Sequence, residues 1–156
     1  MAIEIERKFL VKENVWRPWG QGKIYRQGYI LTQNNMTTVR VRIVGDCAFL
    51  TFKGKTKGFT REEFEYSIPL EDAEIMLENL CDHPLIQKIR YRIHLGNLVW
   101  EVDEFQGENK GLILAEVELS SEDQDFELPA WIGKEVTQDL RFYNINLARY
   151  PYLIWK

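Results

Sequence analysis

The sequence predicts a mainly β domain with some α, in which eight antiparallel strands close into a barrel with a charged interior and about three helices flank it. Three observations lead to this prediction. A chain of 156 residues has the length of one domain, taken as residues 1–156. Short segments alternate between apolar and polar residues, and turn residues separate them. The charged residues of most of these segments are largely of one sign, unlike the mixed charges of ordinary solvent-exposed faces.

The predicted strands are the segments in which apolar and polar residues alternate with period two. They cover residues 2–11, 23–31, 37–44, 47–54, 61–68, 87–95, 98–106 and 112–119. Gly45-Asp46, Gly96-Asn97 and the stretch from Gly107 to Gly111 separate successive segments and favour turns. Strands that are joined by such short turns are expected to be antiparallel.

Helical periodicity occurs in three places, and each predicts a helix. The first covers residues 69–81, with acidic residues in its first turn. The second begins at residues 120–123 and leads into Phe126 and Trp131, and the third covers residues 137–149. With no repeat or linker in the chain, these helices are expected to pack on one β-structure.

The charged positions of the predicted strands are segregated by sign. They are basic in residues 37–44, 47–54 and 87–95, and acidic in residues 61–68, 98–106 and 112–119. Eight strands closed into a barrel leave an interior wide enough for one small ligand. Burying so many dry charges would cost several kcal/mol per ion, so such an interior should hold water, metal or a polyanion. The alternative is a β-sandwich that exposes these charges to solvent.

A linear polyphosphate fits an interior that contains both cations and carboxylates. Arginine and lysine bind phosphate oxygens through charge-assisted hydrogen bonds. Carboxylates can hold divalent cations that bridge to the phosphates, and all-oxygen sites favour Mg²⁺ or Mn²⁺. No cluster of cysteine or histidine points to zinc.

Composition and charge exclude several other classes. The net charge of −4 argues against a nucleic-acid partner or a membrane surface as the target. No segment approaches the roughly 18 apolar residues of a membrane helix. The first residues lack a signal peptide, and Cys47 and Cys81 stand outside any metal or redox motif. A cytoplasmic protein is therefore expected, and a homodimer is compatible with the sequence.

The order of short motifs along the chain resembles the CYTH superfamily, the triphosphate tunnel metalloenzymes. Glu4-Ile5-Glu6-Arg7-Lys8 matches the N-terminal ExExK signature of that family. The further matching motifs are Gln27-Gly28-Tyr29-Ile30, Val39-Arg40-Val41-Arg42, Thr51-Phe52-Lys53, Glu62-Glu63-Phe64-Glu65-Tyr66, Lys88-Ile89-Arg90-Tyr91, Trp100-Glu101-Val102-Asp103, Ala115-Glu116-Val117-Glu118, Val136-Thr137-Gln138-Asp139 and Tyr143-Asn144. Together they span nearly the whole chain.

The resemblance implies a tunnel that binds a triphosphate together with a divalent metal. The residues implied to bind phosphate are Lys8, Arg40, Arg42, Lys53, Lys88 and Arg90, with Arg92 added because it shares their strand face. The implied metal ligands are Glu4, Glu6, Glu116 and Glu118, with Asp103 also in the metal set. Lys88, Glu63 and Glu65 are the implied catalytic residues, the two glutamates acting directly or through metal-bound water.

The single short domain most resembles the small bacterial inorganic triphosphatases. This resemblance implies attack of water on a terminal phosphorus of tripolyphosphate, with release of pyrophosphate and phosphate. Hydrolysis of nucleoside or thiamine triphosphate and a class IV-type adenylate cyclase activity remain as alternatives. A module that binds polyphosphate without cleaving it is the alternative outside enzymes.

Overall fold

The computed structural model describes residues 3–33 and 36–155 and contains the predicted barrel. Each of the eight predicted strands is present, with end points that differ by at most one residue. They are β1 (Ile3–Val11), β2 (Gly22–Ile30), β3 (Thr38–Val44), β4 (Cys47–Lys53), β5 (Thr60–Ile68), β6 (Ile86–Leu95), β7 (Leu98–Phe105) and β8 (Ile113–Glu118). Residue 2, the predicted start of the first strand, lies outside the described residues. A further strand, β9 (Ile132–Glu135), was not predicted.

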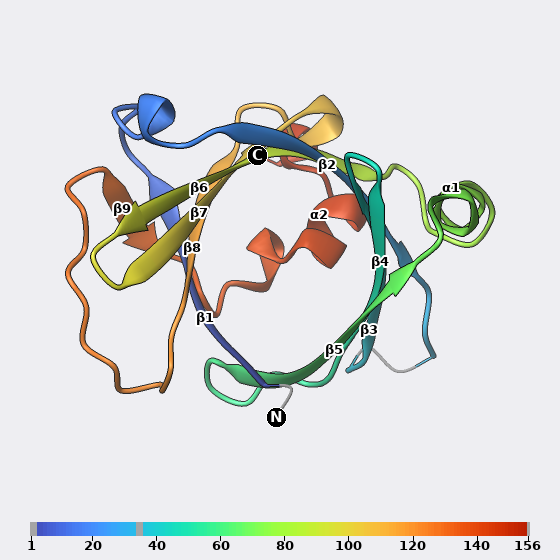
Figure 1. The fold of residues 1–156 in the computed structure, drawn as a ribbon, viewed down its shortest axis with the longest axis horizontal. Coiled ribbons are helices and arrows are strands. Elements are labelled where there is room, and N and C mark those ends of the chain that lie inside the picture. The colour runs from blue at the N-terminus through green and yellow to red at the C-terminus, as the bar shows by residue number, and fades with distance from the viewer. Residues whose placement is uncertain (1–2, 34–35, 156) are drawn as a thin grey trace.

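The eight strands close into an antiparallel barrel, as Figure 1 shows in a view along its interior. Their order around the barrel is β5-β4-β3-β2-β6-β7-β8-β1, and pairing of β1 with β5 completes the ring. In this closing contact Ile3 lies opposite Glu62 and Ile5 lies opposite Thr60. The closed barrel confirms the predicted fold class.

The C-terminal part of the chain completes the edge of β1 beyond its short pairing with β5. The backbone N–H of Lys8 donates to Thr137 Oγ1 at 3.0 Å, and that of Val136 donates to the Lys8 carbonyl at 2.8 Å. Further along, β9 pairs antiparallel with β1 on the outside of the ring. The edge of β1 is therefore covered by residues 132–137, which protects backbone groups that an edge strand would expose.

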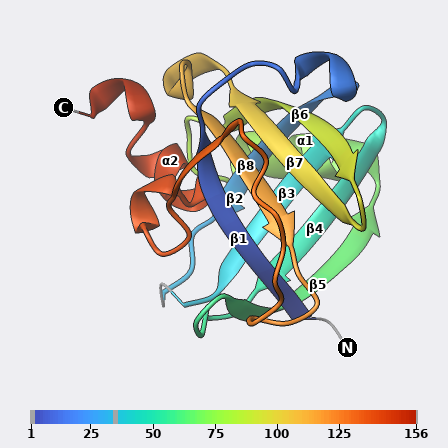
Figure 2. The same ribbon diagram turned by 90° about the vertical axis from the view of Figure 1, so that its left-hand side faces the viewer.

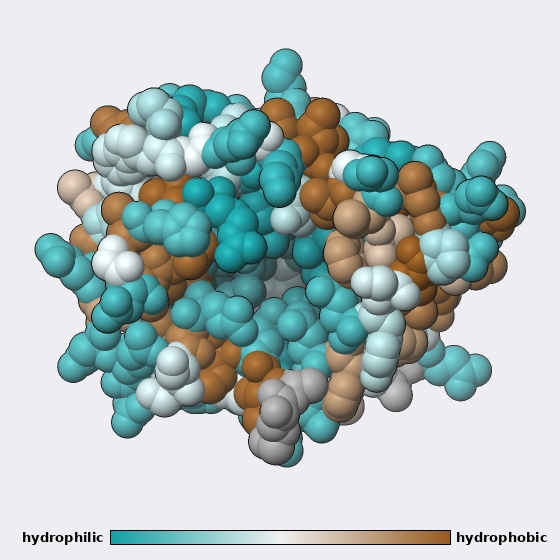
Figure 3. Space-filling model, in the orientation of Figure 1, coloured by the Kyte–Doolittle hydropathy of each residue, from teal (hydrophilic) through white to brown (hydrophobic). Residues whose placement is uncertain are grey.

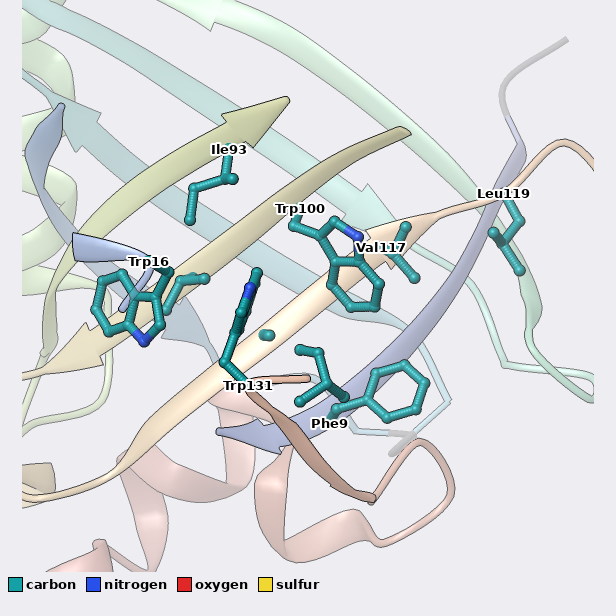
Figure 4. Close-up of a cluster of buried hydrophobic side chains, with 10 residues drawn as sticks. Phe9, Trp16, Ile93, Trp100, Val117, Leu119 and Trp131 are labelled. Carbon is teal, nitrogen blue, oxygen red and sulfur yellow. The ribbon is translucent and has the colours of Figure 1, made fainter. Parts of the chain in front are cut away.

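The apolar side chains of the barrel point outward and form the main hydrophobic clusters. Val117 is buried, although it lies between the charged residues Glu116 and Glu118 of β8. The largest cluster, part of which Figure 4 draws, packs Trp131 of the 120–131 segment against β1, β6, β7 and β8. Its members are Phe9, Trp16, Ile93, Trp100, Val102, Ala115, Val117, Leu119, Trp131 and Ile132. The interior of the barrel is thereby left to polar residues.

The helix predicted over residues 69–81 is present as α1 (Leu70–Asn79). It lies outside the ring in Figure 1. Its buried residues Ala73 and Leu77 pack against Val41, Ile43 and Ala48 of the outer barrel face. The helix α1 therefore covers the hydrophobic cluster that these residues form on the outer face of the barrel.

The helix predicted from residue 120 is absent, and this prediction is wrong. Residues 120–123 form a bend and turn, and residues 124–129 have no regular secondary structure. The Ser120 N–H donates to Gln124 Oε1 at 2.6 Å, and Ser121 Oγ donates to Asp123 Oδ1 at 2.8 Å. These local bonds compete with helix formation. Phe126 and Trp131 instead pack on the outer barrel cluster.

The helix predicted over residues 137–149 is broken in two. A 3₁₀ helix covers Leu140–Phe142 and the helix α2 covers only Asn144–Arg149. Thr137 is held by the edge of β1, and the Asp139 carboxylate accepts from the Arg141 N–H at 3.1 Å. These contacts prevent one continuous helix. Three more 3₁₀ turns cover Arg17–Trp19, Gly107–Asn109 and Tyr152–Ile154, so the described residues form two α-helices instead of three.

The helix α2 lies within the outline of the ring in Figure 1 and at one end of the barrel in Figure 2. Its residues Leu147 and Ala148 are buried in a cluster with Tyr29, Ile86 and Phe105. The C-terminal segment therefore covers one end of the barrel. Among residues 3–33 and 36–155, no helix is long and apolar enough to cross a membrane.

Candidate active site

A cavity of about 390 Å³ occupies the interior of the barrel. Figure 3 shows hydrophilic surface around a hollow at this place. The predicted site residues that line it are Glu4, Glu6, Lys8, Arg40, Arg42, Lys53, Glu63, Glu65, Lys88, Arg90, Arg92, Glu116 and Glu118. Asp103 is fully buried and lies beside Lys88 and Arg90. The structure thus brings the predicted residues together around one cavity.

The strand order divides the cavity wall into a mainly basic half and a mainly acidic half. The contiguous strands β4, β3, β2 and β6 carry the cations Lys53, Arg40, Arg42, Lys88, Arg90 and Arg92. The contiguous strands β7, β8, β1 and β5 carry Asp103, Glu101, Glu116, Glu118, Glu4, Glu6, Glu63 and Glu65, together with Lys8 and Arg61. A polyanion and its metal can therefore meet opposite charges on opposite walls.

Three buried charged groups, Lys88, Arg90 and Asp103, lie where the basic and acidic halves meet between β6 and β7. The Asp103 carboxylate accepts from Arg90 Nε at 2.7 Å and from Arg90 Nη2 at 2.8 Å. Lys88 Nζ lies 2.8 Å from Asp103 Oδ2. Paired charges of this kind offset the cost of removing ions from water. One carboxylate is shared by two cations, so this cluster retains positive charge.

The surroundings of Lys88 make it the most perturbed lysine of the cavity. Burial lowers its pKa to about 7, with Asp103 acting against that effect and the nearby Arg90 and Arg42 adding to it. Its side chain is 1% exposed. An amine with this pKa can exchange a proton near neutral pH.

Arg40 and Arg42 stand on the same face of β3. The guanidinium of Arg40 donates to Thr51 Oγ1 at 3.2 Å and pairs with Glu65 at 3.3 Å. Its Nε atom is buried and has no hydrogen-bond partner among the described residues. Burial and the neighbouring Arg40 and Arg90 lower the pKa of Arg42 to about 9, so that it stays protonated at neutral pH. Both groups fit an anion that supplies the missing acceptors.

Glu4 is held by two cations. Its carboxylate accepts from Lys53 Nζ at 2.9 Å and from Arg61 Nε at 2.9 Å. Burial opposes the ionised form of Glu4, but Lys53 and Arg61 outweigh it and lower its pKa to about 2. Lys53 also lies 3.0 Å from Glu63. Glu4 is therefore ionised, and its two cations link β1, β4 and β5.

Glu6 and Glu116 form a carboxyl pair between β1 and β8. Burial and the charges of Glu116 and Glu4 raise the pKa of Glu6 well above its usual range, and the two carboxyl groups share a hydrogen bond. The pKa of Glu116 is lowered well below its usual range, because Lys8 and Arg90 outweigh the effect of burial. The opposite shifts favour protonation of Glu6 over protonation of Glu116.

This donor set fits a divalent cation. Oxygen ligands of carboxylates suit Mg²⁺ and Mn²⁺, and a cation between Glu6 and Glu116 would offset the repulsion that raises the pKa of Glu6. Burial and the charges of Glu4 and Glu63 also raise the pKa of Glu118, which faces Glu6 across the strand pair. Within residues 3–33 and 36–155, no three acidic, histidine or cysteine side chains already converge as a metal cage.

Two predicted residues differ in environment from the rest. The Arg92 side chain is 60% exposed and lies 4.0 Å from Glu101, so it stands at the rim of the cavity. Lys8 Nζ donates to the Phe142 carbonyl at 3.0 Å and lies over the ring of Tyr143. The C-terminal segment thus holds one of the cavity lysines directly.

The set of site residues predicted from sequence omitted Arg61, Glu101 and Asn144, which also line the cavity. Arg61 and Glu101 share the strand face of Glu63 and Asp103, so the same alternation could have identified them. Asn144 lines the cavity from the start of α2 and accepts from Lys88 Nζ at 2.9 Å. It is uncharged and lies outside the barrel strands, so no charge pattern could have identified it.

The chain is similar to two curated proteins over most of its length. An inorganic triphosphatase of Acetivibrio thermocellus is 46% identical over 156 residues, which cover all of this chain and 99% of that protein. An inorganic triphosphatase of Nitrosomonas europaea is 38% identical over 152 residues, covering 93% of this chain and 96% of that protein.

Solved structures show the same fold. A crystal structure of an inorganic triphosphatase, 36% identical, aligns with a TM-score of 0.66 over 92% of this chain and 96% of the other. A putative adenylate cyclase of Bacillus halodurans, only 18% identical, aligns with a TM-score of 0.63 over 79% of this chain and 84% of the other. The second likeness concerns the fold alone. The sequence of this chain matches the CYTH domain over residues 2–151, and the protein belongs to the CYTH domain family.

Proposed function

We propose that this protein is a divalent-metal-dependent triphosphatase that hydrolyses inorganic tripolyphosphate to pyrophosphate and phosphate in the barrel cavity. The observation that carries the proposal is the division of the cavity wall into a basic and an acidic half. A triphosphate against the basic half leaves its outer oxygens facing the acidic half. A divalent cation between the phosphate oxygens and the carboxylates of the acidic half is then required to offset their mutual repulsion. The names of the two curated relatives support the same reaction.

Arg40, Arg42, Lys53, Lys88 and Arg90 are the proposed phosphate-binding residues of the basic half. Lys8 reaches the same cavity from β1, and Arg92 stands where the substrate enters. The partnerless Nε of Arg40 supports this role, because a buried donor without an acceptor costs about 1–3 kcal/mol. Phosphate oxygens would supply that acceptor.

Glu4, Glu6, Glu116 and Glu118, with Asp103 behind them, are the proposed residues of the metal site, and Mg²⁺ or Mn²⁺ is the proposed ion. Such an ion would neutralise developing negative charge on the phosphate oxygens. In the metal-free protein Asp103 is already paired with Lys88 and Arg90. Its contribution is therefore to hold these two cations in place.

Water attacks the terminal phosphorus, the P–O bond to the bridging oxygen breaks, and pyrophosphate leaves. Lys88 Nζ is the proposed acceptor of the proton from the attacking water, because its pKa of about 7 leaves part of it neutral. Glu63 and Glu65 pair with Lys53 and Arg40. These contacts favour a role in which the two glutamates orient the phosphate-binding cations.

The proposal is tested by the products and the metal requirement of the reaction. Purified protein is incubated with tripolyphosphate and Mg²⁺ or Mn²⁺, and phosphate and pyrophosphate are both measured. The proposal predicts one of each per tripolyphosphate consumed, and no release in the presence of EDTA. Saturable binding of tripolyphosphate without product release would instead indicate a binding module. We also propose that the reaction takes place in the cytoplasm.

A further inference from the structure

A chain of hydrogen bonds links Arg42 to Lys88 through two uncharged amides. Arg42 Nε donates to Gln27 Oε1 at 2.8 Å, and Gln27 Nε2 lies 3.4 Å from Asn144 Oδ1. The same Asn144 oxygen accepts from Lys88 Nζ at 2.9 Å. Gln27 is completely buried, and its Nε2 also donates to the hydroxyl of Tyr29 at 2.9 Å. These amides connect β3, β2, α2 and β6, and Asn144 itself lines the cavity.

We propose that Gln27 and Asn144 are positioning residues that fix Arg42 and Lys88 relative to each other for attack on the terminal phosphate. This inference rests on the proposed function, in which both cations contact the substrate. Gln27 and Asn144 act through the two cations and not on the phosphate itself.

The geometry of the Lys88 ammonium supports this assignment. An ammonium group has three N–H positions. One is directed to Asp103 Oδ2 at 2.8 Å and one to Asn144 Oδ1 at 2.9 Å. Two fixed acceptors determine the direction of the third position, which is left for the substrate. That position carries an N–H in the ammonium form and, in the neutral amine, the lone pair that takes the proton of the attacking water. Without Asn144, the group could rotate about its single contact with Asp103.

Arg42 is held in a similar way. Gln27 occupies the Nε position, so the two terminal nitrogens of the guanidinium remain for phosphate oxygens. The ring of Tyr25 lies against the same group, with the guanidinium carbon 4.9 Å from the ring centroid. Among the described residues, Arg42 has no ion pair with a carboxylate, whereas Arg40, Lys53 and Arg90 each have at least one.

The uncharged nature of the two acceptors is the important feature. A carboxylate in either place would orient the cation equally well but would cancel its charge. An amide oxygen orients the cation and leaves its charge available for a polyanion. The position of a reacting group matters strongly, because a displacement of about 1 Å can reduce a rate by about 100-fold. The amides therefore orient the two cations without placing a further carboxylate against them.

The test compares substitutions that remove the acceptor with one that keeps it. Asn144→Leu and Gln27→Met keep much of the side-chain volume and lack the acceptor, so kcat/KM for tripolyphosphate should fall by about 10-fold or more. Asn144→Asp keeps an acceptor oxygen and adds a charge. It should raise KM about 10-fold while kcat changes less. Asn146→Leu is the matched control, because Asn146 lies on the same helix and its side chain donates to the Leu140 carbonyl at 2.8 Å, away from both cations.

A double-substitution cycle separates positioning from a structural role. In a Lys88→Met background, measured at high enzyme concentration, Asn144→Leu should change the rate less than about twofold, because its target is gone. An undiminished loss in that background would overturn the inference. If Asn144→Leu does not fold, an unchanged KM in Asn144→Asp overturns it.

The outcome also separates this inference from the function on which it rests. If wild-type protein hydrolyses tripolyphosphate and Asn144→Leu does so equally well, the positioning role is wrong and the proposed function stands. If folded wild-type protein releases no phosphate, both are overturned.

Discussion

The carboxyl group of Glu6 is hydrogen-bonded to that of Glu116 across the contact between β1 and β8. These are the first and last strands of the barrel along the chain, so the pair exists only because distant parts of the sequence form adjacent strands. The two carboxyl groups have opposite pKa shifts, with that of Glu6 raised and that of Glu116 lowered. Closure of the fold thus creates an acidic site that one proton or one metal ion can occupy.

Glu6→Gln should remove most of the stabilisation that metal gives without destabilising the metal-free protein. The introduced amide can still donate to Glu116, as the protonated carboxyl does, but it is a poorer ligand for a cation. Wild-type protein should gain about 2.7 kcal/mol of stability at a metal concentration about 100 times the Kd. Thermal melts with and without Mg²⁺ measure this gain. Equal gains in both proteins would show that Glu6 is not a metal ligand.

Arg40→Ala should strongly reduce catalysis and leave the fold intact. The substitution removes a cation with an unsatisfied buried donor, and it also relieves repulsion of Arg42. Charge-assisted hydrogen bonds are worth about 1.5–3 kcal/mol, so kcat/KM should fall about 10- to 100-fold. Arg26→Ala is the control, because Arg26 lies on the outer face and pairs with Glu74. Equal kinetics for the two variants would contradict a phosphate-binding role for Arg40.

Arg90→Ala should reduce stability as well as activity, unlike Arg40→Ala. Arg90 donates twice to the fully buried Asp103, which would keep only Lys88 as a cationic partner. Removing one member of a buried ion pair costs about 3–5 kcal/mol. For a chain of this size that corresponds to a decrease in Tm of about 10 °C. A loss of about 1 kcal/mol lowers the Tm of a chain of this size by about 2–4 °C. A Tm within about 2 °C of the wild type would therefore show that burial of the Asp103 carboxylate does not depend on Arg90.

Glu135→Gln should reduce the loss of folding stability that occurs at acidic pH. Arg7 Nε donates to Glu135 Oε2 at 2.8 Å, and this bond lowers the pKa of Glu135 against the effect of burial. A carboxyl with a lowered pKa stabilises the fold above its unfolded value, here near 4.5, and this contribution is lost as pH falls through the folded value. The variant should therefore lose less stability than wild type between about pH 5 and about pH 3.

Denaturant melts at several pH values measure that difference. Glu74→Gln serves as the control, because its ion pair with Arg26 is exposed to solvent and contributes little. Parallel pH profiles for wild type and Glu135→Gln would show that the Arg7 pair does not hold β9 on the barrel.

The inward-facing residues could be predicted from sequence because a strand alternates strictly between two faces. Once Glu116 faces inward, Val117 must face outward, and the outer clusters confirm this. The basic and acidic halves could not be predicted in the same way. They depend on β6 pairing with β2, although β5 and α1 precede β6 in the chain.

The C-terminal segment was the least predictable part. Its 3₁₀ turn and the short helix α2 are held by long-range contacts. Thr137 binds the backbone of Lys8 across 129 residues, and Asn144 binds Lys88 across 56. No local periodicity contains this information. A local sequence pattern therefore cannot predict the conformation of residues that are held by partners far away in the chain.

The measurement that tests the central claim most directly is kcat/KM for tripolyphosphate, ATP and thiamine triphosphate under identical conditions with Mg²⁺ and with Mn²⁺. The cavity offers charges for three phosphates, and α2 lies at one end of the barrel, where Asn144 and Ile145 line the cavity. The account predicts that tripolyphosphate is hydrolysed with the highest kcat/KM and that EDTA abolishes the activity. A higher kcat/KM for ATP, or cyclic AMP as the main product, would contradict it.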